Sequence, residues 1–244
     1  MAHVELHAEL TADEPTLVEG LPGAGLVGKI AADHLVETFD MEWVGSCFCD
    51  GLPKVAVYRP DDTTTMPPVR LYEDADRDLL VLQSDVPVSP SQASAFTECL
   101  VGWLEREAVF PLFLSGLPEE KSDVPGVYGI ATGGAADRLA ATDVTPPREA
   151  GLISGPTGAL VHEAGARDLA AVALIAETEA RFPDPEAARA VLVDGIAPLA
   201  GIEVETDALV ERAEEIREAR QRLAKQMEEA GDESTEATPI RGFQ

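Results

Sequence analysis

Short apolar runs recur along the chain, and segments with a helical spacing of apolar residues lie between them. Several runs, such as 79–82 and 172–175, are almost continuously apolar, which is typical of strands covered on both faces of a sheet. Bounded by turn residues, these runs predict strands over 16–21, 44–49, 55–58, 79–83, 110–115, 127–131 and 171–175.

Two helix starts are marked by a capping residue before a proline, at Ser89-Pro90 and Asp184-Pro185. The side-chain oxygen accepts hydrogen bonds from the first turn, and proline has the backbone angle of a first helical position. We predict helices from these caps to about 107 and 197, and shorter ones over 134–141 and 157–165. Alternating strands and helices predict an α/β fold, a three-layer αβα domain around a largely parallel mixed sheet.

Residues 1–205 contain no repeat or low-complexity linker, so we interpret them as one domain, with exposed loops at 60–69 and 118–125. Thr206-Asp207 caps a long amphipathic helix predicted over 206–230, in which Leu209, Ile216 and Leu223 are seven residues apart. This helix packs either on its own domain or on a sister subunit. Residues 231–244 are polar and acidic, which predicts a disordered tail.

The chain carries 45 acidic and 18 basic residues, a formal net charge of −27. The acidic excess is spread along the chain, which indicates a halophilic protein whose acidic surface stays hydrated where salt screens its self-repulsion. Nucleic acid is excluded as a partner, because phosphates require basic patches. No segment has the length of a membrane span and the N-terminus lacks a basic signal region, so we expect no membrane partner and a cytoplasmic protein.

A glycine-rich loop follows the first predicted strand and opens a helical pattern. Gly23, Gly25 and Gly28 have the spacing of a dinucleotide-binding loop, and Lys29 follows as in most of a phosphate-binding P-loop. Ile30, however, occupies the place of the P-loop hydroxyl that binds magnesium. The alternative is a tight strand-to-helix turn in which glycine permits close packing. We favour the packing turn and keep the loop as a candidate anion or nucleotide site.

The remaining chemistry-bearing residues form no recognised catalytic set. Only His34 and His162 lie well inside the domain, and no serine has a nucleophile-elbow frame. Cys47 and Cys49 are two apart on a predicted strand and share a face, and with Cys99 they make an odd count without zinc spacing. We interpret them as small buried hydrophobic residues rather than a metal or redox pair. We therefore expect no enzyme, no catalytic residue, no metal site and no cofactor.

Five motifs occur in one order: Glu19-Gly-Leu-Pro-Gly-Ala-Gly-Leu-Val-Gly-Lys29, Gly116-Leu-Pro, Val127-Tyr-Gly-Ile-Ala-Thr132, Gly155-Pro-Thr-Gly-Ala159-Leu, and Ala176-Glu-Thr178 with Pro183-Asp-Pro185. Together they resemble the archaeal branch of the proteasome assembly chaperone family, over roughly residues 13–229. The resemblance implies a fold similar to nucleoside phosphorylases without their catalytic residues, and a homo-oligomer. It also implies 20S proteasome α-subunits as partners, bound in some members through a flexible C-terminal tail.

The family's docking tail ends in a hydrophobic residue, a tyrosine and any final residue, whereas this chain ends in Gly242, Phe243 and Gln244. The aromatic ring is kept, but the phenol hydroxyl and the apolar contact are absent. Their loss is expected to cost on the order of 1–3 kcal/mol in docking. The terminal carboxylate of Gln244 still suits capture by a basic pocket.

Three functions from different classes remain open. The first is a non-enzymatic chaperone or adaptor for proteasome α-subunits. The second is a nucleotide- or phosphate-binding protein that uses Gly23, Gly25, Gly28 and Lys29. The third is a structural homo-oligomer with another client, assembled through the helix predicted over 206–230.

Overall fold

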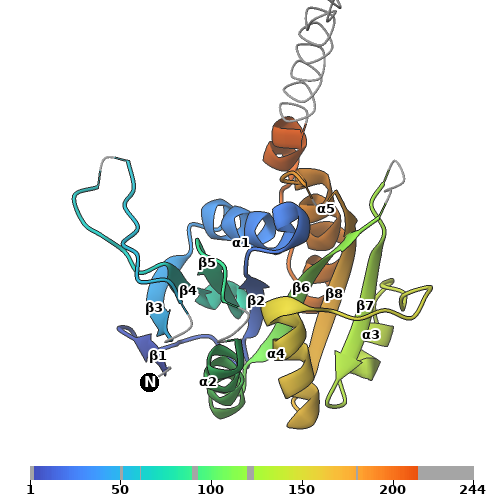
Figure 1. Cartoon of the computed structure of the whole chain (residues 1–244), viewed down its shortest axis with the longest axis horizontal. Helices are drawn as coiled ribbons and strands as arrows, with labels where there is room; N and C mark the ends of the chain where they lie inside the picture. Colours follow the sequence, from blue (N-terminus) through green and yellow to red (C-terminus); the bar gives the residue numbers. More distant parts are fainter. Residues whose placement is uncertain are drawn as a thin grey trace, which may run out of the picture.

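The computed structural model describes residues 3–49, 52–60, 62–89, 93–119, 124–179 and 181–213. Within these ranges, eight strands form one sheet in the order β1-β3-β4-β5-β2-β6-β8-β7 (Figure 1). The strands are β1 (His3–Leu6), β2 (Thr16–Gly20), β3 (Glu42–Phe48), β4 (Val69–Asp74), β5 (Leu79–Ser84), β6 (Phe110–Pro118), β7 (Val127–Thr132) and β8 (Ala171–Thr178).

The sheet is parallel at its centre and antiparallel towards both edges. Strands β5, β2, β6 and β8 run parallel to one another, with Thr16 opposite both Leu79 and Phe110. Strands β1, β3 and β4 continue the sheet antiparallel on the β5 side, and β7 pairs antiparallel with β8 on the other. The predicted α/β fold with a mixed sheet is confirmed, although its parallel part is smaller than we expected.

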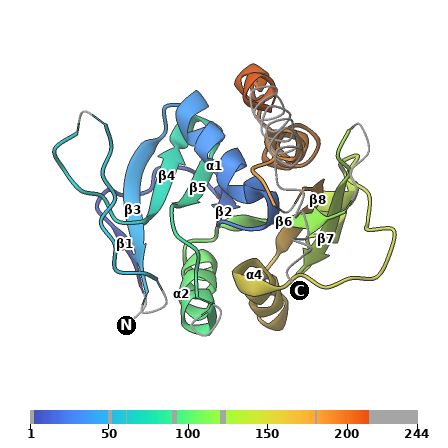
Figure 2. The same ribbon diagram turned by 45° about the horizontal axis from the view of Figure 1, so that its top comes forward.

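Helices cover both faces of the sheet, as Figures 1 and 2 show. One face carries α1 (Val27–Thr38), α5 (Pro185–Ala190), a π-helical segment (Val191–Ile196) and α6 (Ala197–Ala200), whereas the other carries α2 (Ala93–Arg106) and α4 (Gly155–Ala166). Short α3 (Ala136–Ala140) follows β7. Alternate residues of the strands enter the two cores, so that Val18 packs under α1 and Leu17 packs against the α2 side.

The predicted cap at Asp184 is present, because its carboxylate accepts a hydrogen bond from the Ala187 amide at 3.2 Å. The predicted helix from 184 to 197 is not one regular α-helix, since the π-helical segment interrupts it. Gly195 lies there against Leu174 of β8, and a Cβ atom at Gly195 would come within 2.7 Å of the leucine side chain. The interruption thus brings the backbone close to the sheet.

The C-terminal helix begins as predicted, and residues 207–213 are helical. Leu209 is fully buried in the core on the α1 side of the sheet, and Ala213, one turn later, is 7 % exposed. His34 of α1 approaches the carbonyl oxygen of Glu205 at 2.6 Å, just before this helix. The start of the helix therefore packs on its own domain, while the rest of the predicted span 206–230 and the predicted tail 231–244 lie outside the described residues.

The antiparallel side of the sheet next to β5 differs from our expectation. The strand predicted over 55–58 is wrong, because this segment forms only an isolated bridge between Val57 and Met66. The missed strand is β4, whose buried positions include Arg70 and Glu73 and therefore break the apolar pattern. Strand β1 was also missed, because four residues of alternating partial burial leave little signal.

The described part of the chain contains no helix long and apolar enough to cross a membrane.

Candidate functional site

The glycine loop lies at the carboxyl ends of the parallel strands, between β2 and α1. Gly25 is buried with a φ of 61°, and a side chain there would overlap the hydroxyl of Thr178. A Cβ atom on Gly28 would lie 3.3 Å from the Cβ atom of Leu114 and from two backbone oxygens. Gly23, by contrast, faces open space. Close packing therefore accounts for Gly25 and Gly28, as the packing-turn interpretation expects, whereas it does not account for Gly23.

Lys29 is held in a partly buried ionic network. Its ammonium group lies 2.7 Å from Asp33 and 3.0 Å from Asp85, and the guanidinium group of Arg70 lies 2.6 Å from Asp85. Burial acts to raise the pKa of Asp85, but Arg70 and Lys29 outweigh it and hold that pKa below its ordinary value. Two cations and two anions balance in this network, so Lys29 contributes no net positive charge to the loop. Anion binding by Gly23, Gly25, Gly28 and Lys29 stays a prediction.

A buried carboxyl group lies beneath the same loop. Glu19 is 0 % exposed, and its carboxylate accepts hydrogen bonds from the amides of Leu21 and Leu114, each at 3.0 Å. The hydroxyl of Thr157, at the start of α4, lies 3.3 Å from both carboxylate oxygens. Burial raises the pKa of Glu19 to about 7, against the lowering effect of these hydrogen bonds. The group thus joins β2, β6 and α4.

Asp184 holds the other side of the loop. Its amide donates to the carbonyl oxygen of Gly25 at 2.9 Å, and its carboxylate accepts from the Thr178 hydroxyl at 3.1 Å. Gly116 of β6 also lies against the loop, because a Cβ atom there would come within 2.5 Å of the carbonyl oxygen of Ala24. Four of the five sequence motifs therefore meet at the carboxyl ends of the parallel strands. Their polar groups bond to one another, which makes this cluster suited to holding the loop and the helix N-termini in place.

Sequence reasoning did not identify Glu19, Arg70 or Asp85 as members of a site. The signal for Glu19 was present, since it is an acidic residue in an apolar strand directly before the glycines. Its partners Leu114 and Thr157 are far away in sequence, so only the fold reveals the contacts. The candidate residues Gly242, Phe243 and Gln244 lie outside the described residues.

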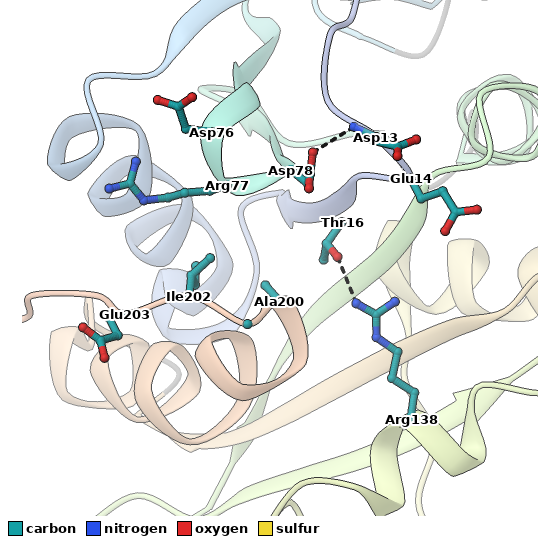
Figure 3. A pocket seen from close by; sticks show the side chains of 11 residues that line it. Asp13, Glu14, Thr16, Asp76, Arg77, Asp78, Arg138, Ala200, Ile202 and Glu203 are labelled. Atoms are coloured by element: carbon teal, nitrogen blue, oxygen red, sulfur yellow. Dashed lines mark hydrogen bonds between the residues drawn. The ribbon is translucent and has the colours of Figure 1, made fainter.

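An open depression of about 700 Å³ lies at the opposite ends of the parallel strands, next to the start of β2 (Figure 3). Arg138 enters it from α3 and donates hydrogen bonds to the Thr16 hydroxyl at 3.2 Å and the Leu199 carbonyl oxygen at 2.8 Å. Arg77 is paired with Asp74 at 2.6 Å. The wall also carries the carboxylates of Asp13, Glu14, Asp76, Asp78 and Glu203. With its arginines engaged, this depression favours cationic groups over phosphates.

Metal binding finds no support in the described part of the chain, where no group of three histidine, cysteine or acidic side chains is arranged to hold a metal ion.

Comparison with known proteins identifies the family of this chain. A model of the PAC2 family matches residues 17–224. Two uncharacterised proteins of Methanocaldococcus jannaschii are similar to this chain. One is 30 % identical over 218 residues, which cover 87 % of this chain and 84 % of the relative. The other is 27 % identical over 223 residues, which cover 90 % and 89 %.

Two solved structures from Pyrococcus furiosus are also similar. PbaA, described as an archaeal homolog of proteasome-assembly chaperone, is 28 % identical with a TM-score of 0.77, over 94 % of this chain and 99 % of PbaA. PbaB, described as an archaeal proteasome activator, is 22 % identical with a TM-score of 0.75, over 91 % of this chain and 98 % of PbaB. The likeness to PbaB concerns the fold alone.

Proposed function

This chain belongs to the PAC2 family, and from that membership we propose that it is a non-enzymatic proteasome assembly chaperone or adaptor. The observation that carries the proposal is the similarity to PbaA over almost the whole of both chains. The proposed partners are the α-subunits of the 20S proteasome, in the cytoplasm. The proposed contact includes the C-terminal residues Gly242, Phe243 and Gln244. We also propose that the chain acts as a homo-oligomer.

The chemistry of the glycine loop supports an adaptor more than a nucleotide-dependent enzyme. Lys29 is neutralised by Asp33 and Asp85, and Glu19 is shielded from solvent and bonded to backbone amides. A nucleophile or general base has to reach a substrate, and neither group is placed to do so.

Large apolar side chains exposed on loops support a function based on protein contacts. Tyr58, after β3, is 82 % exposed, and Leu152, before α4, is 87 % exposed. Apolar and aromatic side chains of this kind form the centres of protein–protein interfaces. They offer the folded domain a means of contact that is independent of the tail.

Co-purification tests the proposal. Full-length protein and a variant truncated after Arg241 are used as baits in lysate of the native host at multimolar KCl. We expect proteasome α-subunits to be retained by the full chain and strongly reduced with the truncated variant, because a terminal carboxylate and an aromatic ring suit capture by a basic, partly apolar pocket. Mass spectrometry of the retained proteins gives the measurement.

Two further variants used as baits test whether the folded domain, rather than the tail, makes the contact. Retention by both the full and truncated chains would assign the contact to the folded domain, and the double variant Tyr58→Ser, Leu152→Ser should then lose it. The single variant Lys54→Ala, on the same loop as Tyr58, is the matched control. Absence of proteasome subunits from every bait at native salt would overturn the proposed function.

Thermal unfolding with a panel of ATP, NAD and inorganic phosphate tests the nucleotide alternative. We expect no rise in Tm at millimolar ligand, because the ionic network leaves no net positive charge beside the loop. A ligand at 100 times its Kd would stabilise the protein by about 2.7 kcal/mol, which corresponds to roughly 5–10 °C in Tm. A rise of that size, abolished by Lys29→Ala and kept by Lys54→Ala, would establish an anion site at the loop instead.

A further inference from the structure

The face of the sheet that carries α2 and α4 has a surface region without charged side chains (Figures 1 and 2). Residues 150–162 contain no aspartate, glutamate, lysine or arginine, and no uncharged run in this chain is longer. Residues 86–97, which lead into α2, form another such run. In a chain with 45 acidic and 18 basic residues, uncharged runs of this length require a physical reason.

Burial does not explain the run at 150–162. Other long uncharged runs of the chain form strands β6 and β7, and their position in the sheet accounts for them. Between 150 and 162, by contrast, Leu160 alone is buried, and Leu152 is 87 % exposed. On α2, Ser94 and Ala95 are exposed as well. Uncharged groups therefore face solvent here, in a protein with a formal net charge of −27.

The two exposed segments lie side by side, because α2 and α4 pack against each other. Both helices begin at the carboxyl ends of the parallel strands, since α2 follows β5 and Thr157 of α4 contacts Glu19 near the end of β2. Their other ends meet where Arg167 contacts Glu105 at 3.1 Å. The first turns of both helices therefore form one surface. We call residues 93–97 and 150–162 the uncharged surface.

The net charge of the chain favours one kind of partner for this surface. Two copies that each carry −27 repel one another, and acidic groups that face each other across a contact oppose binding further. Copies can approach closely where both lack acidic side chains. An uncharged surface also suits a second uncharged surface, because covering it removes no charged group from water. The cores of protein–protein interfaces are depleted of charged residues in the same way.

We propose that the uncharged surface is the contact between two copies of this chain, and that both copies use the same surface. The inference rests on the proposed homo-oligomer and assigns its contact to the folded domain. Such a contact has two-fold symmetry. Leu152 of each copy is covered by the other, and the charged ends of α2 and α4 lie at the solvated rim. The C-terminal tail and Tyr58 are not part of this surface.

Sedimentation equilibrium of the full-length protein in molar KCl tests the contact. We expect the wild type to associate, and Leu152→Glu to raise the dissociation constant about thirtyfold or more, because the second copy would cover a carboxylate. Val193→Glu is the matched control. Val193 is 40 % exposed and lies on the π-helical segment, on the other face of the sheet. This variant adds the same charge and should associate as the wild type does.

Ala95→Glu tests the part of the surface that α2 contributes. Glutamate is a good helix former, so we expect the fold to be kept and the dissociation constant to rise about tenfold or more. Ala140→Glu, at an exposed position of α3, is the matched control and should associate as the wild type does. The Tm of each variant shows whether it is folded under the conditions of the measurement.

Hydrogen exchange of the wild type locates the contact without any substitution. Raising the protein concentration above the dissociation constant should slow the exchange of amides within 93–97 and 150–162. The amides of α1, on the other face of the sheet, should exchange at an unchanged rate. Slower exchange confined to other segments would overturn the assignment, even if a variant does not fold.

The remaining outcomes separate this inference from the proposed function. Unchanged association of both Leu152→Glu and Ala95→Glu would overturn the contact and leave the homo-oligomer in place. Equal losses in Val193→Glu and Ala140→Glu would overturn it too, because the added charge alone would then be the cause. A wild type that is monomeric at every concentration would overturn both the contact and the homo-oligomer. Proteasome retention is measured separately, so its absence does not decide between these outcomes.

Discussion

Replacing Gly25 with alanine should lower the free energy of unfolding by about 2–4 kcal/mol. The position has a φ of 61°, which costs a residue with a Cβ atom about 1 kcal/mol or more. The new methyl group would also overlap the hydroxyl of Thr178, which donates to Asp184 at 3.1 Å. Moving Thr178 disturbs a buried hydrogen bond, and this adds about 1–3 kcal/mol. Urea unfolding at constant molar KCl measures the change.

Gly23→Ala is the matched control, two residues earlier in the same loop. Its φ of −139° is extended, and no atom lies within 4 Å of the added Cβ atom. We expect a change within about 0.5 kcal/mol. Equal effects at Gly23 and Gly25 would show that the packing of the loop against Thr178 does not govern its stability.

Replacing Glu19 with glutamine should remove a pH dependence from the unfolding free energy. The pKa of Glu19 is raised from 4.5 to about 7 in the folded protein, so the folded state binds the proton more tightly. Its stabilising contribution is present below about 4.5 and is lost as the pH rises through about 7. Between pH 5 and pH 8 the wild type should lose about 2–3 kcal/mol through this group.

The Glu19→Gln substitution also lowers the stability of the protein at low pH. A glutamine amide cannot accept from both Leu21 and Leu114, because one of its two polar atoms is a donor. We expect Glu19→Gln to be less stable than the wild type at pH 5 by about 1–3 kcal/mol, with the difference shrinking towards pH 8. Glu37→Gln, at an exposed ion pair with Arg212, is the control and should follow the wild-type pH profile. Parallel profiles for wild type and Glu19→Gln would contradict a raised pKa at this carboxyl group.

The central strands were predictable from the sequence, because strands buried on both faces are continuously apolar. Leu79–Ser84 and Ala171–Thr178 are such cases. Strand β4 was not predictable in this way, because it contains the buried Arg70, whose hydrogen-bond partners include Gln83 and Asp85. Those partners are supplied by the neighbouring strand and the loop after it. A pattern of apolar residues carries no information about a buried charge that is paired.

The candidate site, too, was predictable from the sequence only in part. The glycines and Lys29 stood out in the sequence, and the position of the loop between β2 and α1 follows from the pattern. Neither the pairing of Lys29 with Asp85 nor the contact between Gly25 and Thr178 was predictable, because each depends on strands being neighbours in the sheet. The fold thus determines whether a glycine loop is open to a ligand or filled by its own chain.

The strand order has a consequence for synthesis on the ribosome. Strands β1 to β5 all lie within residues 3–84 and pair with one another, whereas the second edge of β2 meets β6 only after residues 110–118 are made. Until then we expect Glu19 to be ionised and hydrated on an open strand edge. A charge on such an edge opposes pairing with other chains. The same carboxyl group that is buried in the finished domain would thereby protect the nascent chain from aggregation until Leu114 and Thr157 arrive.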